Sequence, residues 1–340
     1  MSEAFIRLGT SDRLDALGVA ADRLGRPAHL LEKDIWVVWA IQQLFGSPIS
    51  ANLVFKGGTS LSKAYHVIDR FSEDVDLTFD IRALIPDLLE GREDALPGTS
   101  SEERRWSKRV RQMLPEWLAG TVRPILQQAI ERDGIAAALR AEGDKLFIDY
   151  PNLARGTGYV SPSVMLEFGA RSTGEPASPR DIVCDAAAVI EGVEFPTARP
   201  RVMHAERTFW EKATAIHVFC VQERLRGDRF SRHWHDVSRL DQAGIAAAAI
   251  DDRALAVTVA RHKSMFFAEK AADSTWVDYG AATSGHLQLV PSGDARGALA
   301  EDYHRMVEDG LLAAKPESFD SLMDRCADIA RRANAAFRTG

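Results

Sequence analysis

The spacing of hydrophobic and polar residues divides the chain into a β-rich first half and an α-rich second half. Apolar residues recur at helical spacing over residues 11–45, and Gly25 and Pro27 split this stretch into two predicted helices. The run LVF (53–55) predicts a short buried strand, TSLSKAYHVI a helix, and DVDLTF (74–79) a second strand. This order indicates an α+β fold followed by a helical region.

Later segments complete this pattern. Residues 87–100 predict a loop, and residues 101–140 a charged helical arm interrupted by Pro115 and Pro124. KLFIDY (145–150) and SPSVMLEFGAR (161–171) predict two more strands, and a Pro-rich connection covers 176–200. Four helices are then predicted over AERTFWEKATAIHVFCVQERL, SRHWHDVSRLDQAG, 250–262 and 317–337.

The stretch FKGGTSLSKAYHVIDRFSEDVDLTFD (55–80) has features that favour phosphate binding. Gly57 and Gly58 allow a sharp turn that approaches a ligand closely, and Thr59 or Ser60 can cap the next helix. Backbone N–H groups at such a helix start favour a phosphate. The candidate nucleotide-binding residues are Lys56, Gly57, Gly58, Thr59, Ser60 and Lys63. The Walker pattern is absent, and a glycine turn alone is weak evidence.

Two aspartates strengthen this interpretation. Asp74 and Asp76 stand two apart on a predicted strand, so their carboxylates point to the same face. Like charges held this close repel one another unless a cation lies between them, and carboxylate oxygens suit Mg²⁺. The alternative is a solvent-facing strand with scattered acids, to which Asp80 would belong. The turn, the helix and the Asp-x-Asp strand together indicate two-metal nucleotidyl transfer.

These motifs resemble the DNA polymerase β type of nucleotidyltransferase. More closely, FKGGTSLSKAYHVIDRFSEDVDL, ERTFWEKATAIH, RHWHDVSRL and HKSMFF resemble the AbiEii/AbiGii toxin family, from about residue 30 to the C-terminus. The resemblance implies a polymerase β-like core, a mixed sheet with helices, in residues 1–200. A mainly helical domain would occupy residues 201–340. It also implies an NTP substrate, two Mg²⁺ ions and a toxin of a toxin–antitoxin or phage-defence system, with a cognate antitoxin as a partner.

A third carboxylate is expected to complete the metal site. Glu167 in VMLEFGAR shares the parity of Met165 and could lie beside Asp76, so it is the first choice. Asp149 in LFIDYP is the competitor, and a simple ion pair of Glu167 with Arg171 is the structural alternative.

The second half offers further candidates. By resemblance, Lys212 matches the lysine expected to contact the nucleotide phosphates, and Asp236 an aspartate that would orient Lys212 or the base. Arg207 and Arg232 are candidate phosphate or RNA contacts. His233, His235 and Asp236, with His217 and Asp241, also permit an HD-type metal phosphohydrolase. That class gives no reason for the glycine turn or the Asp-x-Asp strand.

The charged arm bears on which molecule accepts the transferred nucleotide. Arg104, Arg105, Lys108 and Arg109 lie in EERRWSKRVRQM with Trp106 among them, and they could guide an RNA backbone. A solvated helix face is the default explanation for such a run. The toxin resemblance implies RNA modification, notably at the tRNA 3′ end. A protein or small-molecule hydroxyl and a non-catalytic interaction protein are the alternatives.

Composition limits the classes of protein to which the chain can belong. The 340 residues are 46% hydrophobic, which is enough for a full core, and the net charge of −7 excludes a globally basic nucleic-acid coat. Cys184, Cys220 and Cys326 form no Cys-x-x-Cys pair, so a disulfide framework or zinc finger is not expected. The sequence shows no signal-peptide pattern and no apolar run near 18 residues, which predicts a cytoplasmic protein without membrane spans.

Overall fold

The chain is described by a computed structural model over residues 3–70, 72, 74–154, 161–223, 229–308, 312 and 316–337. Its contacts divide it into two compact units. The first unit consists of Met1–Ala64, Glu73–Ala95 and Trp106–Met203, and the second of Tyr65–Ser72, Leu96–Arg105 and His204–Gly340. The predicted division lies at residue 200, whereas here two short earlier segments join the second unit.

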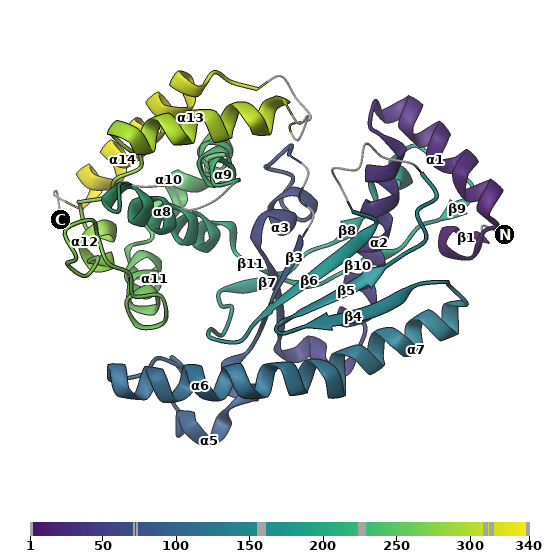
Figure 1. Cartoon of the computed structure of the whole chain (residues 1–340), viewed down its shortest axis with the longest axis horizontal. Coiled ribbons are helices and arrows are strands. Elements are labelled where there is room, and N and C mark those ends of the chain that lie inside the picture. The colour runs from purple at the N-terminus through teal and green to yellow at the C-terminus, as the bar shows by residue number, and fades with distance from the viewer. Residues whose placement is uncertain are drawn as a thin grey trace. The chain divides into compact units, whose positions relative to one another are not determined.

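A seven-stranded mixed sheet forms the first unit (Figure 1). Its strand order is β4-β5-β6-β3-β2-β11-β7, with parallel pairing of β6 with β3 and of β2 with β11, and antiparallel pairing elsewhere. The strands are β2 (Leu53–Lys56), β3 (Asp74–Phe79), β4 (Ala138–Glu142), β5 (Lys145–Asp149), β6 (Ser163–Gly169), β7 (Ala177–Pro179) and β11 (Arg201–Met203). Two small pairs join β1 (Glu3–Ala4) to β9 (Val193–Glu194), and β8 (Ile182–Val183) to β10 (Thr197–Ala198).

The central strands have one apolar and one polar face. Val75 and Leu77 on β3 are buried, as are Leu166 and Phe168 on β6, because a strand turns alternate side chains to the same side. Trp117 packs against Phe79 and Phe168, so the buried face is covered from the end of helix α6. The candidate carboxylates Asp74, Asp76 and Glu167 are intervening residues on the other face, and they are only half-buried. We call this second side of the sheet the open face.

Helices pack beside this sheet in the first unit, and α6 has its residues up to Arg105 in the second unit. Helix α2 is buried along most of its length because its apolar residues cover several faces rather than one stripe. The helices are α1 (Thr10–Leu24), α2 (Ala28–Phe45), α3 (Gly57–Lys63), α4 (Ile81–Leu84), α5 (Pro86–Leu89), α6 (Ser100–Trp117) and α7 (Arg123–Asp133), with a π turn at Leu118–Val122 and 3-10 turns at Phe5–Arg7, Pro48–Asn52 and Asp185–Ala188.

The predicted arm and glycine-turn helix need correction. Pro115 lies inside α6 without ending it, because Trp106, Val110 and Leu114 form one buried stripe along the helix. Pro124 is at the start of α7, where its missing N–H costs little, and the predicted helical end of the arm is strand β4. Helix α3 ends at Lys63, and His66 soon after has a φ of 54°, which a helix cannot accommodate.

The second unit is helical, as predicted. Its helices are α8 (Ala205–Val221), α9 (Ser231–Gln242), α10 (Ile245–Asp251), α11 (Arg253–Phe266), α12 (Tyr279–Thr283), α13 (Gly293–Glu308) and α14 (Phe319–Ala336). The sequence pattern did not predict α10, α12 or α13 in this unit, nor the short strands within 176–203 of the first unit. The three cysteines are buried free thiols. In the described part of the chain, none of the helices has the length and apolar character needed to cross a bilayer.

Candidate active site

The Asp76 carboxylate lies against the glycine turn. Strands β2 and β3 pair antiparallel with Lys56 opposite Asp76, which brings the start of the turn beside the second aspartate. Gly57 has a φ of 77°, and a Cβ placed on it would stand 1.9 Å from Asp76 Oδ2. Glycine is therefore required here both for its backbone conformation and for the space that Asp76 occupies.

The hydroxyl groups of the turn bind the backbone. The Thr59 hydroxyl donates to the Asp74 carbonyl oxygen, and Ser60 Oγ donates to the Gly57 carbonyl oxygen at 2.8 Å. Neither residue caps α3, since the N-cap position is Lys56 and no side chain bonds there. The predicted capping role is therefore wrong, but the Thr59 bond ties the turn directly to the start of β3.

Lys63 forms ion pairs with two carboxylates. Its Nζ lies 2.6 Å from Asp34 Oδ1 and 2.8 Å from Asp185 Oδ1, and the side chain is almost fully buried. Although burial alone would lower the pKa of Lys63, Asp34 and Asp185 raise it. Lys63 is thus held between two carboxylates inside the fold, and its contact with a phosphate stays a prediction.

Glu167 stands directly opposite Asp76 in the parallel pair of β6 and β3. Paired residues on neighbouring strands turn their side chains to the same face, so Glu167 shares the open face with Asp74 and Asp76. Its carboxylate pairs with Lys145, at 3.2 Å between Nζ and Oε2, and not with Arg171 as the structural alternative supposed. Burial would lower the pKa of Lys145, but the carboxylates of Glu167, Asp144 and Asp74 raise it.

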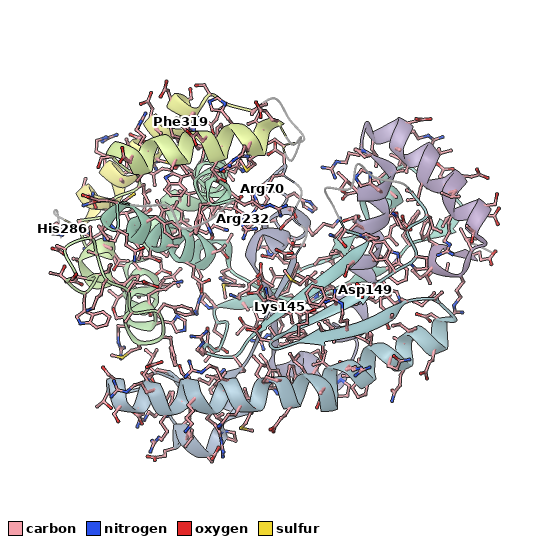
Figure 2. The ribbon with its side chains drawn as sticks, viewed as in Figure 1. Arg70, Lys145, Asp149, Arg232, His286 and Phe319 are labelled. Carbon is pink, nitrogen blue, oxygen red and sulfur yellow. The ribbon has the colours of Figure 1, made fainter. Side chains whose placement is uncertain are left out.

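Asp149 lies farther from the aspartate pair. It ends β5, whereas Lys145 begins it (Figure 2), and it pairs in register with Ser163, four residues before Glu167 on β6. Its carboxylate is 3.4 Å from Arg140 Nε. At about 3.3 Å per residue, the distance along the strand removes Asp149 from the row that contains Asp76 and Glu167.

The carboxylates fit a hard cation, although they do not form a closed ligand set. Asp74 and Asp76 share one face of β3, and their oxygens are the ligands that Mg²⁺ prefers. Among the described residues, no three His, Cys, Asp or Glu side chains are gathered closely enough to hold a metal ion. The predicted three-carboxylate set is thus not assembled here, because the carboxylate of Glu167 is turned to Lys145.

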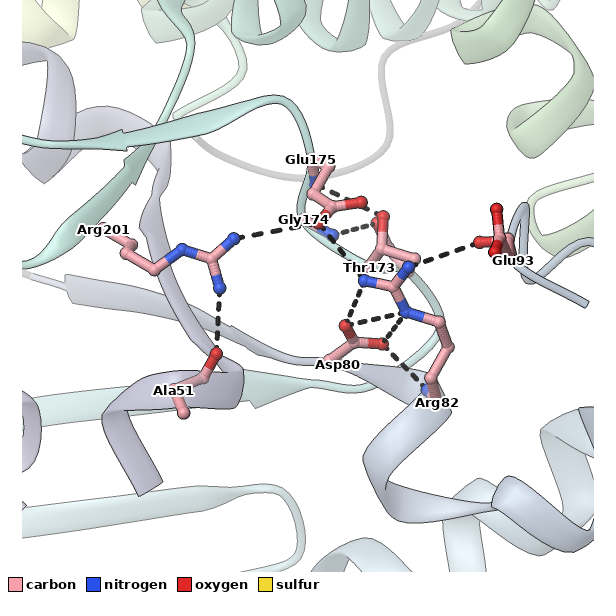
Figure 3. Close-up of polar contacts among 9 residues, drawn as sticks. Ala51, Asp80, Arg82, Glu93, Thr173, Gly174, Glu175 and Arg201 are labelled. Atoms are coloured by element: carbon pink, nitrogen blue, oxygen red, sulfur yellow. Dashed lines mark hydrogen bonds and ion pairs between the residues drawn. The ribbon is translucent and has the colours of Figure 1, made fainter. Parts of the chain in front are cut away.

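Asp80 belongs to a separate structural cluster (Figure 3). It accepts from the backbone N–H of Arg82 as the N-cap of α4, and it forms an ion pair with the Arg82 guanidinium at 2.6 Å. The same guanidinium reaches Glu175 at 3.2 Å. Asp80 therefore does not continue the Asp74 and Asp76 pair as a metal ligand, nor is it a scattered surface acid.

In the second unit, two cationic side chains bind the Asp236 carboxylate. Arg70 donates to both of its carboxylate oxygens, at 2.7 and 2.8 Å, and Lys212 Nζ lies 2.9 Å from Oδ2. Burial would raise the pKa of Asp236, but Arg70 and Lys212 hold it well below its ordinary value. The predicted contact between Lys212 and Asp236 is present. Arg70 was missed, although it stands four residues before Asp74 in the same quoted stretch.

The histidines near Asp236 do not form an HD-type centre. His235 lies 3.5 Å from both Asp69 and Asp236, and Asp69 in turn pairs with Arg239. The other two proposed ligands are used elsewhere. His217 Nδ1 accepts from the backbone N–H of Gln288, and Asp241 pairs with Arg332 at 2.5 Å. Burial, together with Lys212 and Arg232, keeps the pKa of His233 well below its ordinary value.

The candidate RNA contacts separate by exposure. Arg104, Arg105, Lys108 and Arg109 are exposed on α6, with Arg105 near Glu102 and Arg109 near Asp87. Arg232 is half-buried (Figure 2). Arg207, by contrast, is 4% exposed and pairs with Glu211, so little of its side chain is accessible to RNA. Trp106, which lies among these cations in the sequence, is a core residue under the Arg92 guanidinium.

Comparison with known proteins identifies the family. JHP933 from Helicobacter pylori is 15% identical, covers 91% of each chain and has a TM-score of 0.38. A candidate nucleotidyltransferase from H. pylori is also 15% identical, covers 91% of this chain and 95% of its own, and has a TM-score of 0.39. No curated protein matches the sequence. The profile of the nucleotidyl transferase AbiEii toxins of type IV toxin–antitoxin systems matches residues 40–325. The chain therefore belongs to the AbiEii nucleotidyl transferase toxin family and is a nucleotidyltransferase, for which an NTP substrate, a divalent cation and a cognate antitoxin are implied.

Proposed function

We propose that this toxin transfers a nucleoside monophosphate from an NTP to the 3′-terminal hydroxyl of tRNA in a Mg²⁺-dependent reaction. The observation that supports it most is the Asp76 carboxylate lying against the Gly57 turn, with Glu167 opposite it in the next strand. This places a candidate phosphate-binding turn and candidate metal ligands at one point of the sheet. A role in phage defence is part of the same proposal.

The residues have distinct roles in this scheme. The acceptor oxygen attacks the α-phosphorus of the NTP and loses its proton, while the bond to the pyrophosphate oxygen breaks. Backbone N–H groups of the turn from Gly57 to Ser60 hold the triphosphate. Asp74 and Asp76 would hold Mg²⁺, with Glu167 as the third carboxylate, and the cation would supply charge stabilisation at the reacting phosphate.

Lys212 carries the positive charge in this proposal. Lys212 is the cation that offsets the charge developing on the leaving pyrophosphate. Asp236 fixes its position through the 2.9 Å contact, and Arg70 fixes Asp236 through two hydrogen bonds. A bidentate guanidinium restrains both the position and the plane of a carboxylate, so Arg70 acts on the reaction only through Asp236.

The acceptor is inferred from charge. Exposed cations of α6, among them Arg104, Arg105, Lys108 and Arg109, offer contacts to a phosphate backbone, and such contacts are electrostatic and independent of sequence. A protein or small-molecule hydroxyl would use the same carboxylates and the same turn. Only the acceptor-binding surface would differ, so the acceptor has to be tested directly.

Incubation of the protein with Mg²⁺, total tRNA and each α-labelled NTP in turn tests the proposal. We expect label to enter tRNA, to be lost with a tRNA whose 3′ end has been oxidised by periodate, and to be absent with Asp76→Ala. Label in added protein or in a small molecule would overturn the tRNA acceptor while leaving the chemistry in place. If no acceptor takes up label from any NTP with Mg²⁺ or Mn²⁺, the proposed transfer is wrong.

Substitution of Gly57 by alanine should strongly reduce transfer. The new Cβ would displace the Asp76 carboxylate, and a displacement near 1 Å costs about 100-fold in rate. Gly134→Ala is a matched control, since Gly134 has a φ of 64° but nothing lies within 4 Å of its Cβ position. It should keep full activity and lose only about 1 kcal/mol of stability. Equal rates for the two variants would contradict the assigned contact.

A further inference from the structure

Four charged residues form a row across the middle of the sheet. Lys145 pairs in register with Glu167, Glu167 with Asp76, and Asp76 with Lys56. Because residues paired across neighbouring strands share a face, all four side chains start from the open face at one level. The row therefore has two carboxylates at its centre and one lysine at each end.

The lysine on β5 is turned into this row. Its Nζ lies 3.2 Å from Glu167 Oε2, although its flexible four-carbon stem could reach solvent. The two side chains are 37% and 44% exposed, and ion pairs exposed to this extent contribute little to stability. Folding alone does not explain why a cation is placed at the end of the carboxylate row.

The contact sets an ammonium group against Oε2 of Glu167. An ammonium group that contacts a carboxylate oxygen occupies the region that a metal bound to that oxygen would need, and it repels a divalent ion nearby. This agrees with the absence of a closed three-carboxylate set among the described residues.

We propose that Lys145 is a positioning residue whose ammonium competes with a divalent cation for Glu167 in the nucleotide-free enzyme. The inference rests on the proposed function, because it concerns the cation of that reaction. As a consequence, the nucleotide-free enzyme would bind divalent ions weakly. Glu167 would become a metal ligand only after the Lys145 side chain has moved away from it. Lys145 was not among the predicted site residues, although it shares the strand parity of Phe147 and Asp149.

Mn²⁺ binding to the nucleotide-free full chain, followed by electron paramagnetic resonance, tests this without reference to activity. We expect Lys145→Met to bind Mn²⁺ about three- to tenfold more tightly than the unaltered protein, as removal of one partly screened charge implies. Lys145→Gln should behave alike and serves if the methionine variant folds poorly. Arg140→Met is the matched control, because Arg140 is a cation of the neighbouring edge strand that pairs with Glu142 and Asp149 instead. It should leave Mn²⁺ affinity unchanged.

Asp76→Asn, alone and combined with Lys145→Met, tests separately whether the carboxylate row binds the metal and whether Lys145 competes with the metal for Glu167. If Asp76→Asn weakens Mn²⁺ binding while Lys145→Met and Lys145→Gln bring no gain, the competition is overturned and the metal assignment stands. If Asp76→Asn changes Mn²⁺ binding in neither background, the carboxylate row is not the metal site and the proposed function loses its metal. A gain in Lys145→Met that Asp76→Asn abolishes supports both.

Discussion

Asp76→Ala is expected to reduce nucleotidyl transfer by about 10³-fold while the protein stays folded. Asp76 is half-buried on the open face, so its removal takes away a metal ligand and a charge without opening a large core cavity. It also empties the space beside Gly57 that the carboxylate fills. Initial rates with labelled NTP, together with thermal unfolding and circular dichroism of the same preparation, check both parts of the expectation.

Two further variants make this test specific to the row of carboxylates. Glu167→Gln should also lose activity, because Glu167 is the register partner of Asp76. Asp149→Asn should remain active, since Asp149 stands at the other end of β5 beside Arg140. The reverse pattern, with Asp149 required and Glu167 dispensable, would move the third carboxylate to Asp149. An active Asp76→Ala would remove the basis of the proposed site.

Asp236→Ala should destabilise the protein by about 3–5 kcal/mol, because it leaves two buried cations without their counter-charge. Asp236 is fully buried and receives both Arg70 and Lys212. We expect a large fall in the denaturant midpoint, and loss of transfer under conditions where the variant remains folded, because Lys212 is then no longer positioned. Urea unfolding monitored by circular dichroism measures the first effect, and initial rates measure the second.

The neighbouring Asp69 provides the control for this substitution. It pairs with Arg239 at 3.1 Å but is 29% exposed, so Asp69→Asn should cost about 1 kcal/mol or less. Because the pKa of Asp236 is lowered on folding, its stabilising contribution is present above its ordinary value of 3.8 and is lost on acidification below it. A cost for Asp236→Ala no larger than that for Asp69→Asn would show that the buried pairs are not coupled as described.

Local pattern accounts for much of the fold. Period-two alternation in DVDLTF and SVMLEF predicts strands with carboxylates on one face and apolar residues on the other, and β3 and β6 have this form. The main helices of the second half follow from their helical spacing. Boundaries and short elements were less predictable, since α3 ends at Lys63, whereas the pattern predicts a helix as far as Ile68.

Several site assignments depended on partners that sequence spacing does not reveal. Lys63 and Arg207 look like solvated cations in the sequence, but each is buried against carboxylates. Arg70 and Lys145 have no motif of their own, and each acquires its place only when another strand or helix packs beside it. A charged residue that lies close to a motif in the sequence therefore need not be the charged residue that lies close to it in the folded protein.

The order of the motifs and the common face of Asp74 and Asp76 were already fixed by the chain's own sequence, because side-chain direction within a strand follows local geometry. The tertiary structure alone decided that Glu167 lies opposite Asp76, that Asp76 fills the space beside Gly57, and that Lys145 and Arg70 hold the two key carboxylates. These contacts join residues that are distant in the sequence. They depend on strand register and burial, which only the assembled fold defines.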